Sequence, residues 1–490
     1  MKKRWKTIVM TLAAAVICQT MVYGYLPYQN YTYSKSGDSF AEPQAYLPSQ
    51  VIGGETLGIG KFENPSDIFI TDEDIIYVAD TDNSRIVVLN KDLSLKTVIN
   101  RFSNNGQDDS FQKPEGIYVT NDKIYVADTG NKRIVVLDPE GKLIRIYNEP
   151  RIDVEAEKLQ YTPIKIVVDR AERMFVVSRN VNRGIIELDK DGNFTGYFGT
   201  LKTQTDFITA LWKRFMTQEQ IDSGTLTVPT EYSSCDIDDD GFIFTTVSTI
   251  DSSKTSTNAY IQKINSSGVD ILRRQGLHDP IGDLETTDDS GNTVHSQLVD
   301  VCVGKDGRYS VLDQRRGRVF TYDYDGNLLY IFGGSGNNLG QLQLPRALAQ
   351  TSTGQFLVSD GILDRIVVFY PTEYSAMINQ AAEYQYNREY ENAEKQWEKV
   401  LLFSTNFDVA YVGVGKALLR SGKYKEAMEY FKLGGDQALY SKAFKGYRQE
   451  LFDGVFYYIA IGIVVLIGLV VAIKIIRRLK EMRSEGKKGE

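Results

Sequence analysis

Apolar and polar residues alternate in short runs through the middle of the chain, and this alternation predicts β-strands. The clearest copies read IYVADTDNSRIVVLN from Ile76 and IYVADTGNKRIVVLD from Ile124. Each holds two apolar runs around an Asp/Asn/Gly turn, which is the pattern of a β-hairpin. Related copies, one of them degenerate, start at Met174, Asp236, Tyr309 and Phe356. We therefore predict six repeats of about four short strands each.

One small sheet cannot bury both of its faces alone, so the copies must pack radially against one another. The predicted fold class is mainly β, a six-bladed β-propeller over residues 46–371. The sixth copy ends at Tyr370 without a fourth strand, and a matching piece, YLPSQVIGG from Tyr46, precedes the first copy. We predict that this N-terminal strand completes the last blade and closes the ring.

An Asp and an Arg recur five residues apart in the hairpin turns of the copies. The pairs are Asp80/Arg85, Asp128/Arg133, Asp313/Arg318 and Asp360/Arg365, and Ser178 stands in place of the Asp before Arg183. A ring of carboxylates could hold a metal or a substrate. A carboxylate at a strand end also accepts turn N–H groups and pairs with an Arg of the same hairpin. Because the pattern recurs blade after blade, we interpret these residues as structural.

The run of Asp, short polar turn, Arg and aliphatic strand resembles the NHL-repeat family of six-bladed propellers, over residues 46–371. The resemblance implies a binding surface for proteins, peptides or carbohydrates. It also implies a rival class, because some six-bladed relatives are lactonases with a central calcium ion or lyases that use zinc with histidines.

After Pro371 the apolar period becomes helical. Tyr390, Ala393 and Trp397 recur 34 residues later as Tyr424, Ala427 and Phe431. This pattern resembles tetratricopeptide (TPR) repeats, about two copies over residues 373–450, which implies helix pairs that bind proteins or form a stalk. Two copies are fewer than such repeats need alone, so we expect this segment to lean on the propeller or on a partner.

Two apolar segments with basic flanks predict the topology. Residues 1–24 have the pattern of a secretory signal, with an uncleaved N-terminal anchor as the alternative, and 25–45 read as a linker. Residues 455–473 carry no charge and are long enough for a transmembrane helix, with a buried soluble helix as the alternative. The basic tail, 474–490, should be cytoplasmic and the propeller extracytoplasmic, on a single-pass cell-membrane protein.

Charge and composition narrow the function classes. The net charge is −8, and both ends are basic, so the body between them is strongly acidic, unlike a nucleic-acid binder. Two His and three Cys are too few for a usual zinc site, although oxygen ligands for calcium are plentiful. Cys235 and Cys302 fall one position apart in the repeats, so we expect two core thiols, with a disulfide as the alternative.

Three insertions interrupt the repeats, at 200–231, 248–259 and 275–297. Functional sites tend to lie where a regular scaffold is broken, and the loops should gather over blades three to five. The first insertion has a helical apolar pattern, and the third contains both histidines. The candidate binding residues are Phe207, Trp212, Arg214, Phe215, His278 and His295.

The layout favours a membrane-anchored binding or scaffold protein that presents a propeller and TPR-like helices to protein or carbohydrate partners, as part of an envelope or uptake complex. The alternative is a calcium-dependent hydrolase of the lactonase type. The sequence contains no nucleophile motif of the G-x-S-x-G kind and no phosphate-binding loop. We therefore expect neither catalytic residues nor a resident metal.

Overall fold

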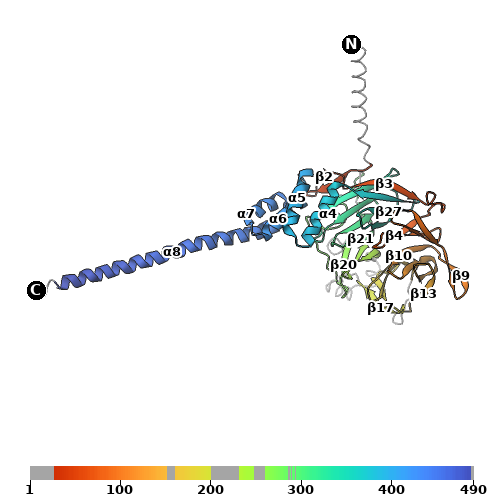
Figure 1. Ribbon diagram of the computed structural model, residues 1–490, viewed down its shortest axis with the longest axis horizontal. Helices are drawn as coiled ribbons and strands as arrows, with labels where there is room; N and C mark the ends of the chain where they lie inside the picture. Colours follow the sequence, from red (N-terminus) through yellow and green to blue (C-terminus); the bar gives the residue numbers. More distant parts are fainter. Residues whose placement is uncertain are drawn as a thin grey trace, which may run out of the picture.

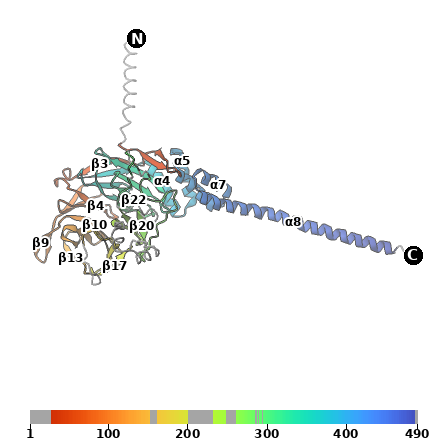
Figure 2. The ribbon, with the colours of Figure 1, turned by 180° about the vertical axis from the view of Figure 1, so that it is seen from behind.

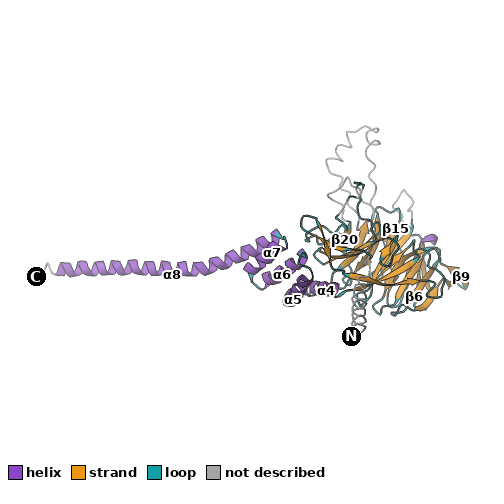
Figure 3. Cartoon of the chain, turned by 90° about the horizontal axis from the view of Figure 1, so that it is seen from above, coloured by secondary structure: helices purple, strands orange, loops and turns teal. Residues whose placement is uncertain are grey.

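The computed structural model shows a ring of small β-sheets, then four helices over residues 373–433 and one long helix from residue 437 (Figure 1). The structure describes residues 27–151, 161–199, 231–247, 260–284, 287, 290–292 and 294–486. Figures 2 and 3 show the sheets at one end, the four helices beside them, and the long helix projecting away from the body. The six-bladed, mainly β propeller expected from the sequence is confirmed.

The blades are antiparallel sheets whose first strands contact one another around the ring axis. Blade 1 contains β4 (Pro65–Ile70), β5 (Ile76–Asp80), β6 (Arg85–Leu89) and β7 (Leu95–Ile99). Blade 2 contains β10 (Pro114–Val119), β11 (Ile124–Asp128), β12 (Arg133–Leu137) and β13 (Leu143–Tyr147). Blade 3 contains β14 (Pro163–Val168), β15 (Met174–Ser178), β16 (Ile185–Leu188) and β17 (Phe194–Phe198). A hairpin, β8 (Arg101–Asn104) and β9 (Gln107–Ser110), links the first two blades.

The second half of the ring is less regular. Blade 4 contains β18 (Tyr232–Ile237), β19 (Ile243–Val247) and β20 (Ile261–Ile264), and only the bridge Ile264–Asp270 stands in place of an outer strand. Blade 5 contains β21 (Leu298–Val303), β22 (Tyr309–Asp313), β23 (Arg318–Tyr322), β24 (Leu328–Ser335) and the short β25 (Gln341–Leu342). Blade 6 contains β26 (Pro345–Gln350), β27 (Phe356–Asp360) and β28 (Arg365–Pro371).

The N-terminal strand closes the ring as the sequence predicts. β3 (Tyr46–Gly53) pairs antiparallel with β28, in a register that sets Gly53 opposite Arg365 and Tyr46 opposite Pro371. The first and last parts of the propeller therefore share one blade, and the ring cannot open without breaking this pairing.

Burial explains the two kinds of apolar pattern. The second strand of every blade is buried at all five positions, because neighbouring blades cover both of its faces. The outer strand β7 is exposed over its first three residues, since only one neighbour reaches it. Inner strands therefore read as continuous apolar runs, and outer strands do not.

The stretch that the sequence analysis treats as a linker, 25–45, contains a hairpin. β1 (Asn30–Tyr33) pairs with β2 (Ser39–Glu42). The Tyr374 and Ser404 hydroxyls donate to the Glu42 carboxylate at 2.7 and 2.8 Å, and Lys35 Nζ donates to the Gly435 carbonyl at 2.8 Å. The hairpin thus lies between the propeller and the helices.

Four helices follow β28 and pack in antiparallel succession. They are α4 (Glu373–Tyr386), α5 (Tyr390–Phe403), α6 (Asp408–Arg420) and α7 (Tyr424–Leu433). Trp397 and Phe431 are fully buried at equivalent places in α5 and α7. Gly413 of α6 faces the Trp397 indole so closely that a Cβ there would lie 2.4 Å from Nε1, which explains the small residue at this position.

The helices and the last two blades share one hydrophobic core. Phe332 and Phe369 of the propeller belong to the same buried cluster as Ile378, Trp397 and Phe407 of the helical segment. Tyr330 also donates to Asn379 at 2.9 Å across the junction. The propeller and the helices therefore form one packed body.

The long helix α8 (Gln437–Gly486) first packs on α7 and then leaves the body. Its span Gln437–Lys480 is the one helix in the described part of the chain that is long and apolar enough to cross a membrane. The predicted transmembrane segment, 455–473, lies inside it, where the apolar side chains are exposed. The helical segment is therefore joined to the candidate membrane span without a break in the helix.

Candidate functional site

The repeated Asp and Arg residues close the turns between the second and third strands. Asp80 and Arg85 are register partners, and Arg85 Nε donates to Asp80 at 2.6 Å. Arg133 Nε donates to Asp128 at 2.7 Å in the same way. Asp128 also accepts the backbone N–H of Gln112. These contacts connect the turn to the loop that enters the first strand.

In blade 2 the arginine has a further acidic partner. Arg133 also binds Asp109 of the β8–β9 hairpin through two bonds of 2.9 and 3.0 Å. The hydrogen bonds from Arg133 lower the pKa of Asp109 to about 2. In blade 3, Ser178 accepts the Thr162 N–H at 2.8 Å, the role that Asp plays elsewhere, and Arg183 lies in the turn before β16.

The same pairing does not form in blades 5 and 6, which corrects the expectation of one ion pair per hairpin. Arg318 is the register partner of Asp313, but its guanidinium lies 2.7 Å from Asp283, a carboxylate that the third insertion supplies. Arg365 donates to the carbonyl oxygens of Asn337, Asn338 and Gln341. Asp360 accepts only backbone N–H groups in the described contacts, from Gln343, Leu344, Ile362 and Leu363.

Asp283 joins the N-terminal hairpin to blade 5. The Tyr31 hydroxyl donates to it at 2.9 Å, Tyr33 donates through a short contact, and Arg318 stacks over the Tyr31 ring at 4.9 Å. Burial, with the negative charge of Asp283, raises the pKa of both tyrosines. This cluster had no signal in the sequence, because its members lie about 250 residues apart.

The candidate binding residues of the insertions are only partly described. Phe207, Trp212, Arg214 and Phe215 lie outside the described residues. His278 Nε2 donates to the Ser34 carbonyl at 2.6 Å, so the hairpin covers this part of the third insertion. His295 is half-buried just before β21. The role of these six residues in binding stays a prediction.

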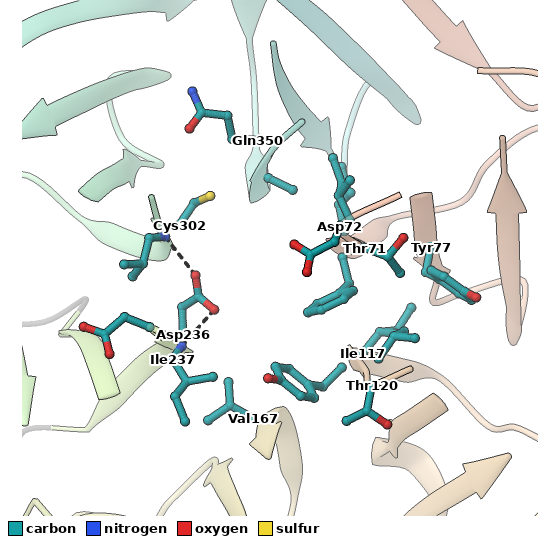
Figure 4. Close-up of a pocket in the computed structure, with 18 of the residues that line it drawn as sticks. Thr71, Asp72, Tyr77, Ile117, Thr120, Val167, Asp236, Ile237, Cys302 and Gln350 are labelled. Atoms are coloured by element: carbon teal, nitrogen blue, oxygen red, sulfur yellow. Dashed lines mark hydrogen bonds between the residues drawn. The ribbon is translucent and has the colours of Figure 1, made fainter. Parts of the chain in front are cut away.

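A cavity of about 480 Å³ lies at the centre of the ring (Figure 4). It is lined by the ends of the first strands and by the loops that follow them, including 71–73, 119–121 and 237–239. The third insertion enters the opposite end of β21, so the cavity opens on the other face of the propeller from that insertion. Its walls combine apolar side chains with a Phe69–Tyr118 edge contact at 5.0 Å.

A cluster of charged residues crosses the ring axis, and one of its members, Lys165, lines the cavity. The third residues of the six first strands are Asp67, Gly116, Lys165, Ser234, Asp300 and Ala347. Lys165 Nζ lies 2.6 Å from Asp67 Oδ1 and 3.4 Å from Asp300 Oδ1, so one ammonium connects three alternate blades. Burial lowers the pKa of Lys165, but Asp300 and Asp67 outweigh that effect and raise it above its usual value.

The same carboxylates also bind backbone groups of the next blade. Asp67 accepts the N–H of Ile117 at 2.8 Å, and Asp300 accepts that of Leu348 at 2.8 Å. Burial raises the pKa of Asp67 to about 6, against the opposing effect of Lys165. These residues were not among those predicted from the sequence, although a charge inside an apolar inner strand was a usable signal.

Asp236, the fifth residue of β18, is a third acid near the axis and is half-buried. It accepts the N–H groups of Ile237 at 2.9 Å and Val303 at 2.8 Å, and it lies on the cavity wall opposite Asp72 (Figure 4). Burial raises its pKa to about 6. Cys235 and Cys302 line the same cavity as free thiols, as the expectation of two unbonded cysteines predicts, and the disulfide alternative does not form.

The described residues do not fit a metal centre. Across the described ranges, no group of three or more His, Cys, Asp or Glu side chains is placed to hold a metal ion. The nearby acids are instead engaged with Lys165 or with backbone N–H groups. No described feature therefore favours the calcium-dependent alternative.

Comparison with protein-family models supports the repeat assignment. Residues 111–137, from the loop before β10 through β12, match the NHL repeat model. The chain carries an NHL repeat. This matched segment contains Asp128 and Arg133, the pair on which the resemblance rests. No curated protein sequence matches the chain.

The solved structures similar to this chain have low sequence identity to it. Virginiamycin B lyase from Staphylococcus aureus is 13% identical, with a TM-score of 0.40, over 66% of this chain and 99% of that chain. The WD40 β-propeller domain of Doa1 is 11% identical, with a TM-score of 0.40, over 67% of this chain and 98% of that chain.

Proposed function

We propose that the protein is a membrane-anchored, extracytoplasmic binding or scaffold protein for protein partners, with peptides or carbohydrates as further ligand classes. The observation that carries this proposal is the hydrophobic core shared by blades 5 and 6 and helices α4–α7. A shared core holds the surfaces of the propeller and of the helices in a constant relation. That property suits a platform that positions partners near a membrane.

The proposed orientation rests on the flanks of the apolar part of α8. Phe452, Phe456, Tyr457 and Tyr458 lie at or just before its start, and Lys474, Arg477, Arg478 and Lys480 follow it. Aromatic residues favour the membrane interface, and basic residues favour the cytoplasmic side. The propeller would then lie outside the cytoplasm, with the signal proposed for residues 1–24 directing it there.

The helices α4–α7 are the proposed TPR-like partner surface. Their aromatic and small residues repeat with the 34-residue period, and each repeat supplies one buried aromatic anchor. Large apolar side chains remain exposed at the ends of α5 and α7, where Leu402 is 85% and Leu433 is 61% exposed. Exposed apolar side chains of this kind mark interaction surfaces when they gather together.

A site-specific photo-crosslinker tests this proposal. Benzoylphenylalanine would replace Leu402 in the full chain in its native membrane, with Lys96 on outer strand β7 as the matched exposed control. We expect one discrete crosslinked product from position 402 and none from position 96. Loss of the product on replacing Leu433 by Glu would assign it to the helical surface. Equal products at both control and test positions, or none at either, would contradict the proposal.

A further inference from the structure

The central cavity carries an inference that goes beyond the proposed partner binding and does not depend on it. The starting observation is an imbalance of charge around the cavity, which opens on one face of the propeller. Asp236 and Lys165 line the cavity, whereas Asp67 and Asp300 contact Lys165 from outside the lining, and Lys165 is the one basic side chain that binds Asp67 or Asp300 in the described structure. Lys165 is already shared by Asp67 and Asp300, so Asp236 has no cation of its own.

The contacts of Asp236 show how it could receive a ligand. Its described hydrogen bonds come from two backbone N–H groups, one on each carboxylate oxygen. A carboxylate has about four lone-pair sites, so about two remain for further donors. The side chain is half-buried, and the cavity that it lines is the route by which it meets solvent.

The mouth of the cavity is acidic as well. Asp72, Glu73, Asp238 and Asp239 line it together with Lys305. Lys305 binds Asp72 at 2.9 Å, and Lys263 binds Asp238 at 2.8 Å. A surplus of carboxylates in a concave, partly apolar space attracts cations and repels anions.

The apolar walls of the cavity favour an organic cation over an inorganic one. Ile117, Val167, Val301 and the Phe69–Tyr118 pair give the cavity apolar and aromatic surface. An inorganic ion would leave that surface unused and would find no cluster of three ligands in the described residues. An ammonium group on an apolar or aromatic body would use the carboxylate, the walls and the aromatic rings together.

We propose that the central cavity binds a small organic primary ammonium compound, with its ammonium group on Asp236 and its apolar body against the Phe69–Tyr118 wall. A cavity of about 480 Å³ is within the usual range for small-molecule sites. The ligand enters from the face opposite the third insertion, which carries the candidate binding residues His278 and His295.

Calorimetry with two isosteric probes tests the proposal on the full chain in detergent. We expect benzylammonium to bind and benzyl alcohol, its neutral counterpart, to bind at least about tenfold more weakly, as for loss of a charge-assisted hydrogen bond. Asp236→Asn should weaken benzylammonium binding by a similar factor. Asp82→Asn, on the opposite face, is the matched control and should leave it unchanged. Equal affinity of the two probes, or of the Asp236→Asn variant and the wild type, would overturn the proposal.

A second measurement keeps the test valid if Asp236→Asn does not fold. Cys302, on the blade after that of Asp236, also lines the cavity and is partly exposed. The labelling rate of its thiol therefore reports the electrostatic potential inside the cavity. In the unmodified protein, a cationic methanethiosulfonate should label Cys302 at least about tenfold faster than an anionic one, after normalisation to glutathione. Benzylammonium should slow this labelling. A normalised ratio near one, without protection by benzylammonium, would reject a cation site.

Discussion

Lys165 Nζ lies 2.6 Å from Asp67 Oδ1, so an ammonium on the third blade pairs with a carboxylate on the first blade across the axis of the ring. Asp300 of the fifth blade completes the contact at 3.4 Å. The propeller is therefore joined in two ways. Apolar side chains fill the spaces between neighbouring blades, and one buried ion cluster connects alternate blades at the centre.

Removing the central ammonium should destabilise the ring strongly. Lys165→Met leaves two buried carboxylates without their cation, which costs about 3–5 kcal/mol of unfolding free energy. The penalty should shrink as the pH falls, because burial raises the pKa of Asp67 and the variant lacks the Lys165 charge that opposes this rise, so Asp67 becomes protonated. Urea unfolding of the purified chain at pH 8 and pH 5 measures both effects. The triple variant Lys165→Met/Asp67→Asn/Asp300→Asn is the control and should recover part of the loss; no loss in Lys165→Met would contradict this role.

Asp236 should make stability depend on pH. Burial raises its pKa to about 6, so the folded chain holds this proton more tightly than the unfolded chain, whose carboxyl has the ordinary value of 3.8. The contribution of Asp236 to stability is therefore present below pH 4 and is lost as the pH rises to about 6. Asp236→Asn should remove this pH dependence. Between pH 4 and pH 7, the unfolding free energy of the variant should therefore rise by on the order of 2 kcal/mol relative to that of the wild type. Parallel stability curves for the two proteins would contradict the assignment.

The ring could be predicted because the blades repeat. The features at which single blades depart from the repeat could not be predicted in this way. Six copies and the unpaired strand from Tyr46 were enough to place the blades and the closure, because each blade buries the same pattern. Asp67, Lys165 and Asp300 were missed because this position is not the same residue in all blades, although aligning the third residues of the first strands displays their charges.

Contacts between segments far apart in the chain could not be predicted from the sequence. The turn spacing predicted an Asp313–Arg318 pair, but the third insertion brings Asp283 to Arg318, and the N-terminal hairpin adds Tyr31 to the same group. Nothing in residues 25–45 indicated that they would fold onto residues 278–283. The packing of the helices was easier to foresee, because two repeats with exposed apolar faces need a neighbour.

The Asp283 cluster should hold the N-terminal hairpin in place. Arg318→Ala removes the cation that contacts both Asp283 and Tyr31, so amide hydrogen exchange in residues 30–42 should rise by about tenfold or more. Arg85→Ala, at the same repeat position in blade 1, should leave exchange in the hairpin unchanged, because Arg85 binds Asp80 and nearby carbonyls. Equal exchange in both variants would show that the cluster does not hold the hairpin.

The proposed orientation can be tested by labelling intact cells with a membrane-impermeant maleimide. Lys190→Cys places a thiol in an exposed turn of blade 3, and Ser484→Cys places one in the basic tail. We expect labelling of position 190 in intact cells with a permeabilised outer wall, and of position 484 only after lysis. The reverse pattern would place the propeller in the cytoplasm.

The central claim is that the propeller, the N-terminal hairpin and the helices form one rigid body that continues into α8. Pulsed electron–electron double resonance tests this claim with one spin label at Lys190→Cys in blade 3 and one at Lys425→Cys in α7, both at exposed positions. The full chain would have its natural cysteines changed to Ala and would be reconstituted in lipid nanodiscs. The shared core predicts a single narrow distance distribution that is the same in detergent and in lipid. A broad or two-peaked distribution would show that the propeller and the helices move independently, and would contradict the account.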